Sequence, residues 1–231
     1  MRILLINPVA RLREPPNALP MGLGYIAASL VQEGHAVQVY DINAVRWSDD
    51  EVKRKIEGEI DRFDAVGIGG LITTYKYVKW LISIIKGCRR DIPVIVGDNG
   101  ATFSYHLYLG KAGADIAVLG EGDITIKELV RALETKKDIG TVEGAAFKRG
   151  GQICTTPPRK RIRDLDSLPY PAWDLFPIEV YINSNFSERF AHKRSLAVSA
   201  TRGCPYPCIF CYPSFGRTVT MRSARSIVDE F

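Results

Sequence analysis

The sequence has 231 residues, of which 46% are hydrophobic and 25% are charged. These proportions are typical of an ordinary globular protein and exclude a collagen-like or largely disordered chain. No apolar run reaches the roughly 18 residues that a membrane helix needs, so we expect a cytoplasmic protein without a membrane partner. The net charge of +5 is mild. Its clearest source, the basic run 159–163, is typical of a solvated linker, and we expect no nucleic-acid partner.

Short runs rich in β-branched residues alternate with helical patterns in the first 140 residues. Such apolar runs are typical of strands buried on both faces of a sheet, and they lie at 3–6, 36–40, 65–68, 94–96 and 116–119. Between them, apolar residues recur three and four positions apart, as they do from 23 to 31, which predicts amphipathic helices. The alternation predicts an α/β domain over residues 1–140, with a doubly wound, parallel, five-stranded, Rossmann-like sheet.

Small and polar residues follow the predicted strands. In open α/β sheets the ligand crevice lies at this edge, and glycines there let a flat ligand approach the backbone. The residues concerned are Asn7, Pro8, Asp41, Gly69, Gly70, Thr73, Thr74, Gly97, Asp98, Asn99, Gly100, Gly120, Glu121, Gly122 and Asp123. Turn chemistry alone also places Gly and Asp at strand ends, so both interpretations stay open. Neither GxGxxG after the first strand nor GxxxxGK[ST] occurs, which removes the usual support for dinucleotide and P-loop nucleotide binding.

The pattern changes after residue 140. Residues 144–155 predict a β-hairpin that turns at Gly150 and Gly151. Several prolines follow, which forbid a long helix and predict an extended linker, so we assign 141–194 to the hairpin and linker. A strand is expected at 196–199, at the start of a second unit that occupies 195–231.

Three of the five cysteines, Cys204, Cys208 and Cys211, lie in one short segment. An odd count with this clustering favours metal binding over a disulfide framework. Three thiolates from one loop suit an iron–sulfur cluster that keeps one iron open to a reactant. A zinc site is the alternative, and because zinc normally takes a fourth protein ligand, His192 is the nearby candidate.

The cysteine motif resembles that of the radical S-adenosylmethionine superfamily. The spacing is CxxxCxxC, with Phe210 before the third cysteine and the segment 201–203 before the first. The α/β domain, the linker segment 155–174 and residues 222–230 resemble the cobalamin-binding branch of that superfamily. In that branch a doubly wound domain precedes a catalytic (β/α) barrel.

The resemblance implies cofactors and their sites. Cys204, Cys208 and Cys211 would hold a 4Fe-4S cluster whose open iron binds S-adenosylmethionine, with Phe210 near its adenine. Cobalamin (B12) would lie on the strand-end loops and the start of the first helix. The implied contacts are Asn7, Pro8, Met21, Gly22, Leu23, Gly69, Gly70, Leu71, Ile72, Thr73, Thr74, Gly97, Asp98, Asn99, Gly120, Glu121 and Gly122.

The resemblance also implies an activity. It is methyl transfer to an unactivated carbon through a 5′-deoxyadenosyl radical. The implied partners are a reductant such as flavodoxin or ferredoxin and a small-molecule or peptide substrate. Two alternatives stay open: a cobalamin-binding or partner-docking module without catalysis, and a radical enzyme that cyclises or rearranges its substrate.

Three features depart from the pattern of this branch. The DxHxxG motif is absent, since no His occurs between residues 7 and 20. The segment 97–100 reads Gly-Asp-Asn-Gly where many relatives have Gly-Gly-Pro-His. Only 20 residues follow Cys211, whereas a barrel needs roughly 200. The resemblance therefore predicts the N-terminal part of an enzyme, with a truncated barrel start and no catalytic residue beyond the cysteine loop, inactive by itself.

Overall fold

The structure is a computed structural model that describes residues 1–11, 14, 16, 19–183, 194–212 and 214–230. Within these residues the main sheet contains seven strands, which lie in the spatial order β2-β1-β3-β4-β5-β6-β7. They are β1 (Arg2–Asn7), β2 (Ala36–Asp41), β3 (Ala65–Ile68), β4 (Val94–Val96), β5 (Ile116–Val118), β6 (Ala145–Arg149) and β7 (Gln152–Thr155). The first five pair in parallel. The expected α/β fold and its five parallel strands are confirmed.

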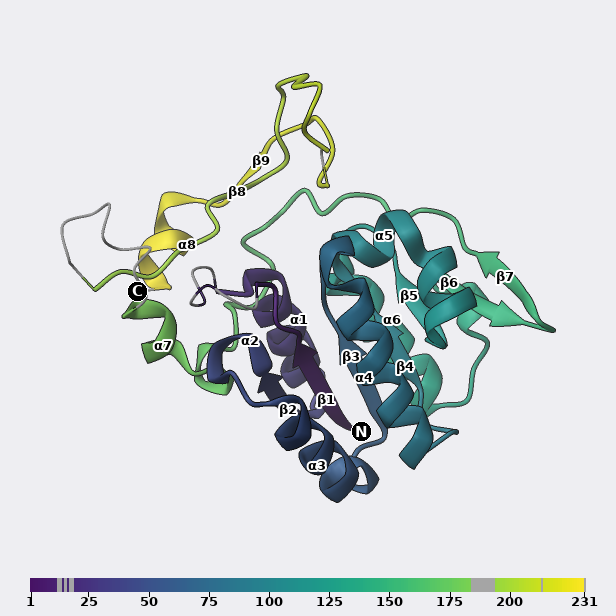
Figure 1. Ribbon diagram of the computed structural model, residues 1–231. Coiled ribbons are helices and arrows are strands. Elements are labelled where there is room, and N and C mark those ends of the chain that lie inside the picture. Colours follow the sequence, from purple (N-terminus) through teal and green to yellow (C-terminus); the bar gives the residue numbers. More distant parts are fainter. Residues whose placement is uncertain (12–13, 15, 17–18, 184–193, 213, 231) are drawn as a thin grey trace.

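Helices cover both faces of the sheet (Figure 1). One face carries α1 (Met21–Gln32) and α6 (Gly122–Glu134), and the other carries α3 (Asp49–Glu59), α4 (Tyr75–Cys88) and α5 (Asp98–Leu107). The shorter helical elements are α2 (Ile42–Val45), η1 (Ile60–Arg62), η2 (Ile72–Thr74), η3 (Tyr108–Ala112), η4 (Ile139–Thr141), η5 (Trp173–Leu175), α7 (Ile178–Ile182) and α8 (Ala224–Asp229). None of the described helices is long and apolar enough to cross a membrane.

The alternation of side chains along β1 explains why two helical layers form. Leu4 and Ile6 belong to the core beneath α3, α4 and α5, whereas Ile3 and Leu5 belong to the core beneath α1 and α6. All four side chains are at most 2% exposed. A strand that is apolar at every position must be covered on both faces, as the sequence pattern indicates.

The predicted hairpin is part of the same sheet. It turns at Gly150 and Gly151, whose φ values of +57° and +82° favour glycine. β6 pairs antiparallel with β5, with Phe147 opposite Ile116. The sheet thus has seven strands instead of the five expected, because the hairpin adds an antiparallel edge.

The linker runs back over α1. The N–H of Ala172 donates to the carbonyl of Gly24 (3.2 Å). A Cβ atom on Gly24 would lie 3.0 Å from Cβ of Pro171, so the missing side chain lets the two segments touch. Tyr181 of α7 packs in a small cluster with Leu19.

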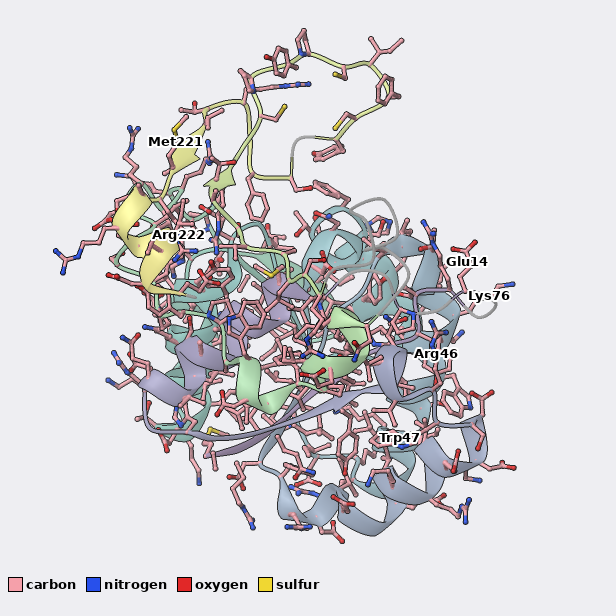
Figure 2. The ribbon with its side chains drawn as sticks, turned by 90° about the vertical axis from the view of Figure 1, so that its left-hand side faces the viewer. Glu14, Arg46, Trp47, Lys76, Met221 and Arg222 are labelled. Atoms are coloured by element: carbon pink, nitrogen blue, oxygen red, sulfur yellow. The ribbon has the colours of Figure 1, made fainter. Side chains whose placement is uncertain are left out.

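The prediction of a strand at 196–199 is wrong. The second sheet is a short antiparallel ladder in which β8 (Thr201–Arg202) pairs with β9 (Thr220–Met221). Leu196 instead packs against the cluster formed by Leu19, Ala44 and Tyr181. In Figure 1 the loop between β8 and β9 extends away from the main sheet, and in Figure 2 Met221 and Arg222 lie where this hairpin joins the rest of the molecule.

Candidate functional site

A cavity of about 510 Å³ lies at the carboxyl edge of the parallel strands. Most of the predicted cobalamin contacts line it. They are Asn7, Pro8, Met21, Gly22, Leu23, Gly69, Gly70, Leu71, Thr74, Gly97, Asp98, Asn99, Gly120, Glu121 and Gly122. Ile72 and Thr73 do not line it and are exposed, because η2 turns them outward. The sheet edge at which the sequence predicts a ligand crevice therefore contains a cavity.

The cavity continues as an apolar slot between the sheet and two helices, α1 and α6. Leu5, Gly67 and Ile95 line it from the strands, and Ile26 and Ile126 line it from the helices. A Cβ atom on Gly67 would lie 2.6 Å from Cδ2 of Leu5, so the slot depends on this missing side chain. Gly67 is not among the residues predicted from the sequence. Glycine inside a strand, which often marks a close approach by another group, is the signal that could have found it.

The start of α5 forms one wall of the cavity. The N–H of Gly100 donates to the carbonyl of Gly70 (3.1 Å). A Cβ atom on Gly100 would lie 2.5 Å from that carbonyl oxygen and 2.6 Å from the hydroxyl of Tyr108. Asp98 has a φ of +69°, which is rare for a residue other than glycine and stores backbone strain. The two segments at this wall are thus closely fitted.

A buried carboxylate orients Asn7 at the opposite wall. Asp41 is 2% exposed and accepts hydrogen bonds from Nδ2 of Asn7 (2.8 Å), the hydroxyl of Tyr181 (2.7 Å) and the N–H of Ala44 (3.0 Å). Burial raises the pKa of Asp41, although these hydrogen bonds oppose the shift. Asn7 therefore faces the cavity with its amide fixed from behind.

The segment after β1 is held by side chains from α2 and its end. The backbone N–H of Ala10 donates to Oδ1 of Asn43 (3.0 Å), and both residues line the cavity. Arg46, seen near Glu14 in Figure 2, donates to the carbonyls of Arg11 (2.6 Å) and Glu14 (2.5 Å). Neither Asn43 nor Arg46 belongs to a motif that sequence reasoning could select.

An ion cluster closes the cavity on the side of α6. Arg202 of β8 donates to both carboxylate oxygens of Asp123, at 2.7 and 3.0 Å, and to Glu121 at 3.2 Å. All three residues are less than 9% exposed and line the cavity. Burial lowers the pKa of Arg202, but the contacts with Asp123 and Glu121 outweigh it and the net shift is upward. Glu121 and Asp123 are both among the strand-end residues singled out from the sequence, but only Glu121 is among the implied cobalamin contacts.

The part of the cysteine loop that follows Cys211 lies at the mouth of the cavity. Ser214 and Phe215 line the cavity, and the ring of Tyr212 lies 3.8 Å from that of Phe103 in α5. Cys204, Cys208 and Cys211 are all exposed, and Phe210 is 90% exposed. In the part of the chain that the structure describes, no three metal-ligating side chains gather into one group. His192, the alternative zinc ligand, lies outside the described residues.

Comparison with known families identifies the domain that contains the cavity. A model described as the B12 binding domain matches residues 15–130. The chain belongs to the B12-binding domain family. The match includes the helix start and the loops after β3, β4 and β5, so most of the cavity wall lies within the B12-binding domain.

Curated relatives extend the likeness beyond the B12-binding domain. An uncharacterized methyltransferase of Pyrococcus horikoshii is 31% identical over 91% of this chain and 44% of its own length. The anaerobic magnesium-protoporphyrin IX monomethyl ester cyclase of Synechocystis sp. is 29% identical over 91% of this chain and 42% of its own. The chain thus spans less than half the length of these relatives.

Solved structures share the fold of this chain. The cobalamin-dependent S-adenosylmethionine radical enzyme OxsB, with aqua-cobalamin and S-adenosylmethionine bound, superposes with a TM-score of 0.81 and 18% identity over 99% of this chain and 31% of its own. The radical S-adenosylmethionine methyltransferase TsrM of Kitasatospora setae superposes with a TM-score of 0.75 and 20% sequence identity, over 99% of this chain and 44% of its own. A further TsrM structure contains cobalamin and a [4Fe-4S] cluster. These structures share the fold expected from the sequence, and the family match confirms its B12-binding domain.

The residues present fit both expected groups. The cavity at the carboxyl edge, with the apolar slot beside Gly67 and the glycines at 69, 70, 97 and 120, offers room for a flat ligand in the B12-binding domain. Three thiols on one exposed loop are a donor set that suits iron–sulfur clusters. The cysteines would need to converge on binding, which an exposed loop permits.

Proposed function

We propose that this chain is the cobalamin- and cluster-binding part of a radical S-adenosylmethionine enzyme that transfers a methyl group to an unactivated carbon. The observation that carries the proposal is the meeting of two sites. Ser214 and Phe215 of the cysteine loop line the same cavity as the strand-end glycines of the B12-binding domain. A group held by the cysteines would therefore lie next to a group held in the cavity.

In the first site, the B12-binding domain would hold the corrin at the carboxyl edge of the sheet. The small residues at 69–70, 97 and 120 let a macrocycle approach the backbone closely. The apolar slot beside Gly67 would receive the planar base of the cobalamin tail, because aliphatic side chains line it. Asn7 and Asn43 would supply amides for the polar rim.

In the second site, Cys204, Cys208 and Cys211 would ligate a 4Fe-4S cluster. Phe210 would lie beside the adenine of S-adenosylmethionine, since it is exposed and precedes the third cysteine. When bound, the cluster with S-adenosylmethionine supplies an electron and a carbon radical, and cobalamin supplies a methyl carrier. The substrate, a small molecule or a peptide, and a reductant such as flavodoxin or ferredoxin belong to the whole enzyme.

We assign residues 1–140 to the B12-binding domain, 141–194 to the hairpin and linker, and 195–231 to the start of the barrel. A second candidate activity is cyclisation or rearrangement. It is favoured by the match to a cyclase, which is nearly as similar to this chain as the methyltransferase is. A cobalamin-binding or partner-docking module without catalysis is the third, and in its cobalamin-binding form it predicts corrinoid binding without iron.

Filling the slot tests the first site. Gly67→Val adds a branched side chain at a position where even a single Cβ atom would lie 2.6 Å from Cδ2 of Leu5. We expect the wild-type chain, mixed with hydroxocobalamin and desalted, to retain a visible corrinoid band, and Gly67→Val to lose at least about tenfold in affinity, as a steric mismatch of about 1.4 kcal/mol would produce. Gly87→Val is the control, because nothing lies within 4 Å of a Cβ at Gly87. Equal retention by wild type and Gly67→Val, or none by the wild type, contradicts the proposal.

A further inference from the structure

The hairpin that carries the three cysteines joins the B12-binding domain through a short ladder. Strands β8 and β9 have only two residues each, so their backbone hydrogen bonds fix the direction of the loop weakly. Arg202 of β8 is nevertheless only 8% exposed. Arginine is almost never fully buried unless it is paired. Its burial two residues before Cys204 therefore points to a specific role at the base of the loop.

Arg202 is held from several sides. Its two terminal nitrogens donate to both carboxylate oxygens of Asp123, and one of them also reaches Glu121. Its guanidinium carbon lies 5.1 Å from the ring centre of Tyr25 and 5.5 Å from that of Phe215. Two parallel hydrogen bonds between a guanidinium and a carboxylate fix the orientation of the arginine side chain as well as its position. The geometry sets the direction in which β8 leaves the domain.

The same two carboxylates belong to the wall of the cavity. Glu121 and Asp123 flank Gly122, the first residue of α6. The second oxygen of Glu121 accepts the N–H of Ile162 in the linker (2.8 Å). Arg161 then donates to the carbonyl of Thr218 in the hairpin (2.5 Å). One loop of the B12-binding domain thus holds both the linker and the cysteine hairpin.

A second arginine secures the returning strand against α1. Arg222, directly after β9, pairs with the buried carboxylate of Glu230. It also donates to the carbonyl of Ser199 (3.3 Å) and to the hydroxyl of Tyr25 (3.4 Å). Tyr25 of α1 therefore contacts an arginine from each side of the hairpin base, since Arg202 lies over its ring.

We propose that Arg202, Glu121 and Asp123 form a positioning clamp that sets the cysteine loop over the cavity. Arg202 acts as a positioning residue, because it holds the loop and is not itself a cluster ligand. The proposal rests on the proposed function, since the clamp would fix the distance between the cluster on the loop and the corrin in the cavity. Reactions between two bound groups depend steeply on such placement, and about 1 Å of error costs roughly 100-fold in rate.

Hydrogen exchange tests the clamp without any cofactor. Arg202→Lys keeps the positive charge beside Glu121 and Asp123 but removes the fork. We expect amides in 201–204 and 218–222 to exchange at least about tenfold faster in this variant, while those of α6 keep their wild-type rates. Arg217→Lys is the matched control, because Arg217 lies exposed on the same hairpin. Arg202→Met, which leaves both carboxylates without this cation, should enlarge the effect.

A distance measurement tests the consequence for the two sites. The chain is reconstituted anaerobically with iron, sulfide and hydroxocobalamin and then reduced. Pulsed electron paramagnetic resonance then reports the separation of cobalt(II) and the reduced cluster. We expect one narrow distance distribution in the wild type and in Arg217→Lys, and a broadened or shifted one in Arg202→Lys with unchanged iron and corrinoid content.

The outcomes separate the two proposals. A wild-type chain that fails to retain iron or corrinoid overturns the proposed function, while the exchange rates still decide whether Arg202 anchors the hairpin. Wild-type exchange in Arg202→Lys and Arg202→Met overturns the clamp. An unchanged cobalt-to-cluster distance in a loaded Arg202→Lys chain also overturns it, because a residue of purely structural importance leaves this distance unaltered.

Discussion

Asp41 is a buried carboxylate behind the cavity wall. Its burial disfavours the charged form, and its hydrogen bond orients Asn7. Its oxygens satisfy Asn7, Ala44 and Tyr181, and almost none of the residue is exposed to solvent. Desolvation makes the charged form unfavourable, whereas the hydrogen bonds favour it. Desolvation dominates, so the pKa of Asp41 is raised by burial. The same buried carboxylate whose charged form is disfavoured also accepts the hydrogen bond that orients Asn7 at the cavity.

The raised pKa predicts a pH-dependent stability difference. Above the ordinary value of 3.8, the folded chain binds a proton at Asp41 more tightly than the unfolded chain does. The contribution of Asp41 to the free energy of unfolding therefore falls as pH rises from 3.8 through the folded-state pKa, and stays low above it. Asp41→Asn does not titrate, so its stability relative to wild type should increase over that interval.

Urea unfolding at several pH values between about 4 and 8 measures this difference. A difference between Asp41→Asn and wild type that stays constant over the whole interval would show that the carboxyl keeps an unshifted pKa. Corrinoid retention by the variant reports separately on Asn7, because the introduced amide still offers an oxygen acceptor to Nδ2 of Asn7.

Single residues also show how far the sequence could predict the site. Most of the glycines and polar residues chosen at strand ends line the cavity, because every parallel strand brings its carboxyl end to one edge. Ile72 and Thr73 lie in the same loop as Leu71 and Thr74 but face outward. Which residues of a loop face inward depends on its turn, and sequence spacing does not encode that. The role of Arg202 could not be predicted for another reason, because its partners Asp123 and Glu121 lie 79 and 81 positions away in the sequence.

The contact between α5 and the loop after β3 is a tight fit between elements at the cavity. Gly100 lies in the first turn of α5, against the carbonyl of Gly70 and the hydroxyl of Tyr108. Backbone atoms cannot move aside as the end of a flexible side chain can. The position of the cavity wall therefore depends on the absence of a side chain at Gly100.

Gly100→Ala should separate these elements. We expect a loss of about 1–3 kcal/mol in the free energy of unfolding, as overpacking typically costs, together with weaker corrinoid retention. Gly87→Ala, at an open helical position of α4, should instead gain about 0.5–1 kcal/mol through helix propensity. Urea unfolding measures both variants. A Gly100→Ala chain as stable as wild type would mean that the wall is loosely packed.

Elements built from local signals are predictable from the sequence, and those that depend on distant partners are not. β1, β3, β4 and β5 contain runs of buried apolar or small residues, so the sequence alone indicates burial on both faces. The edge strand β2 contains Gln38 and is fully buried only at Tyr40 and Asp41, so the expectation of burial on both faces is wrong there. The hairpin is indicated by its glycine turn, but its pairing with β5 depends on which sheet edge is open. The segment 196–199 has strand-like composition, yet the ladder forms at 201–202 instead, where β9 supplies a partner.

In the molecule as a whole, the linker contacts both the B12-binding domain and the cysteine hairpin. Arg159 pairs with Glu128 of α6 and donates to Thr125 (2.7 Å), and Arg161 donates into the hairpin. Two arginines of the basic run thus hold parts of this chain together. With Glu121, which accepts the N–H of Ile162, they fix the path of the linker between residues 159 and 162.

The most direct test of a joint cobalamin and cluster site is anaerobic reconstitution of the chain with iron, sulfide and hydroxocobalamin, followed by desalting, metal analysis and a visible spectrum. We expect about four irons per chain and a retained corrinoid band. Changing Cys204, Cys208 and Cys211 together to Ala should remove the iron and leave the corrinoid. Zinc in place of iron, with no corrinoid retained, would contradict the joint site.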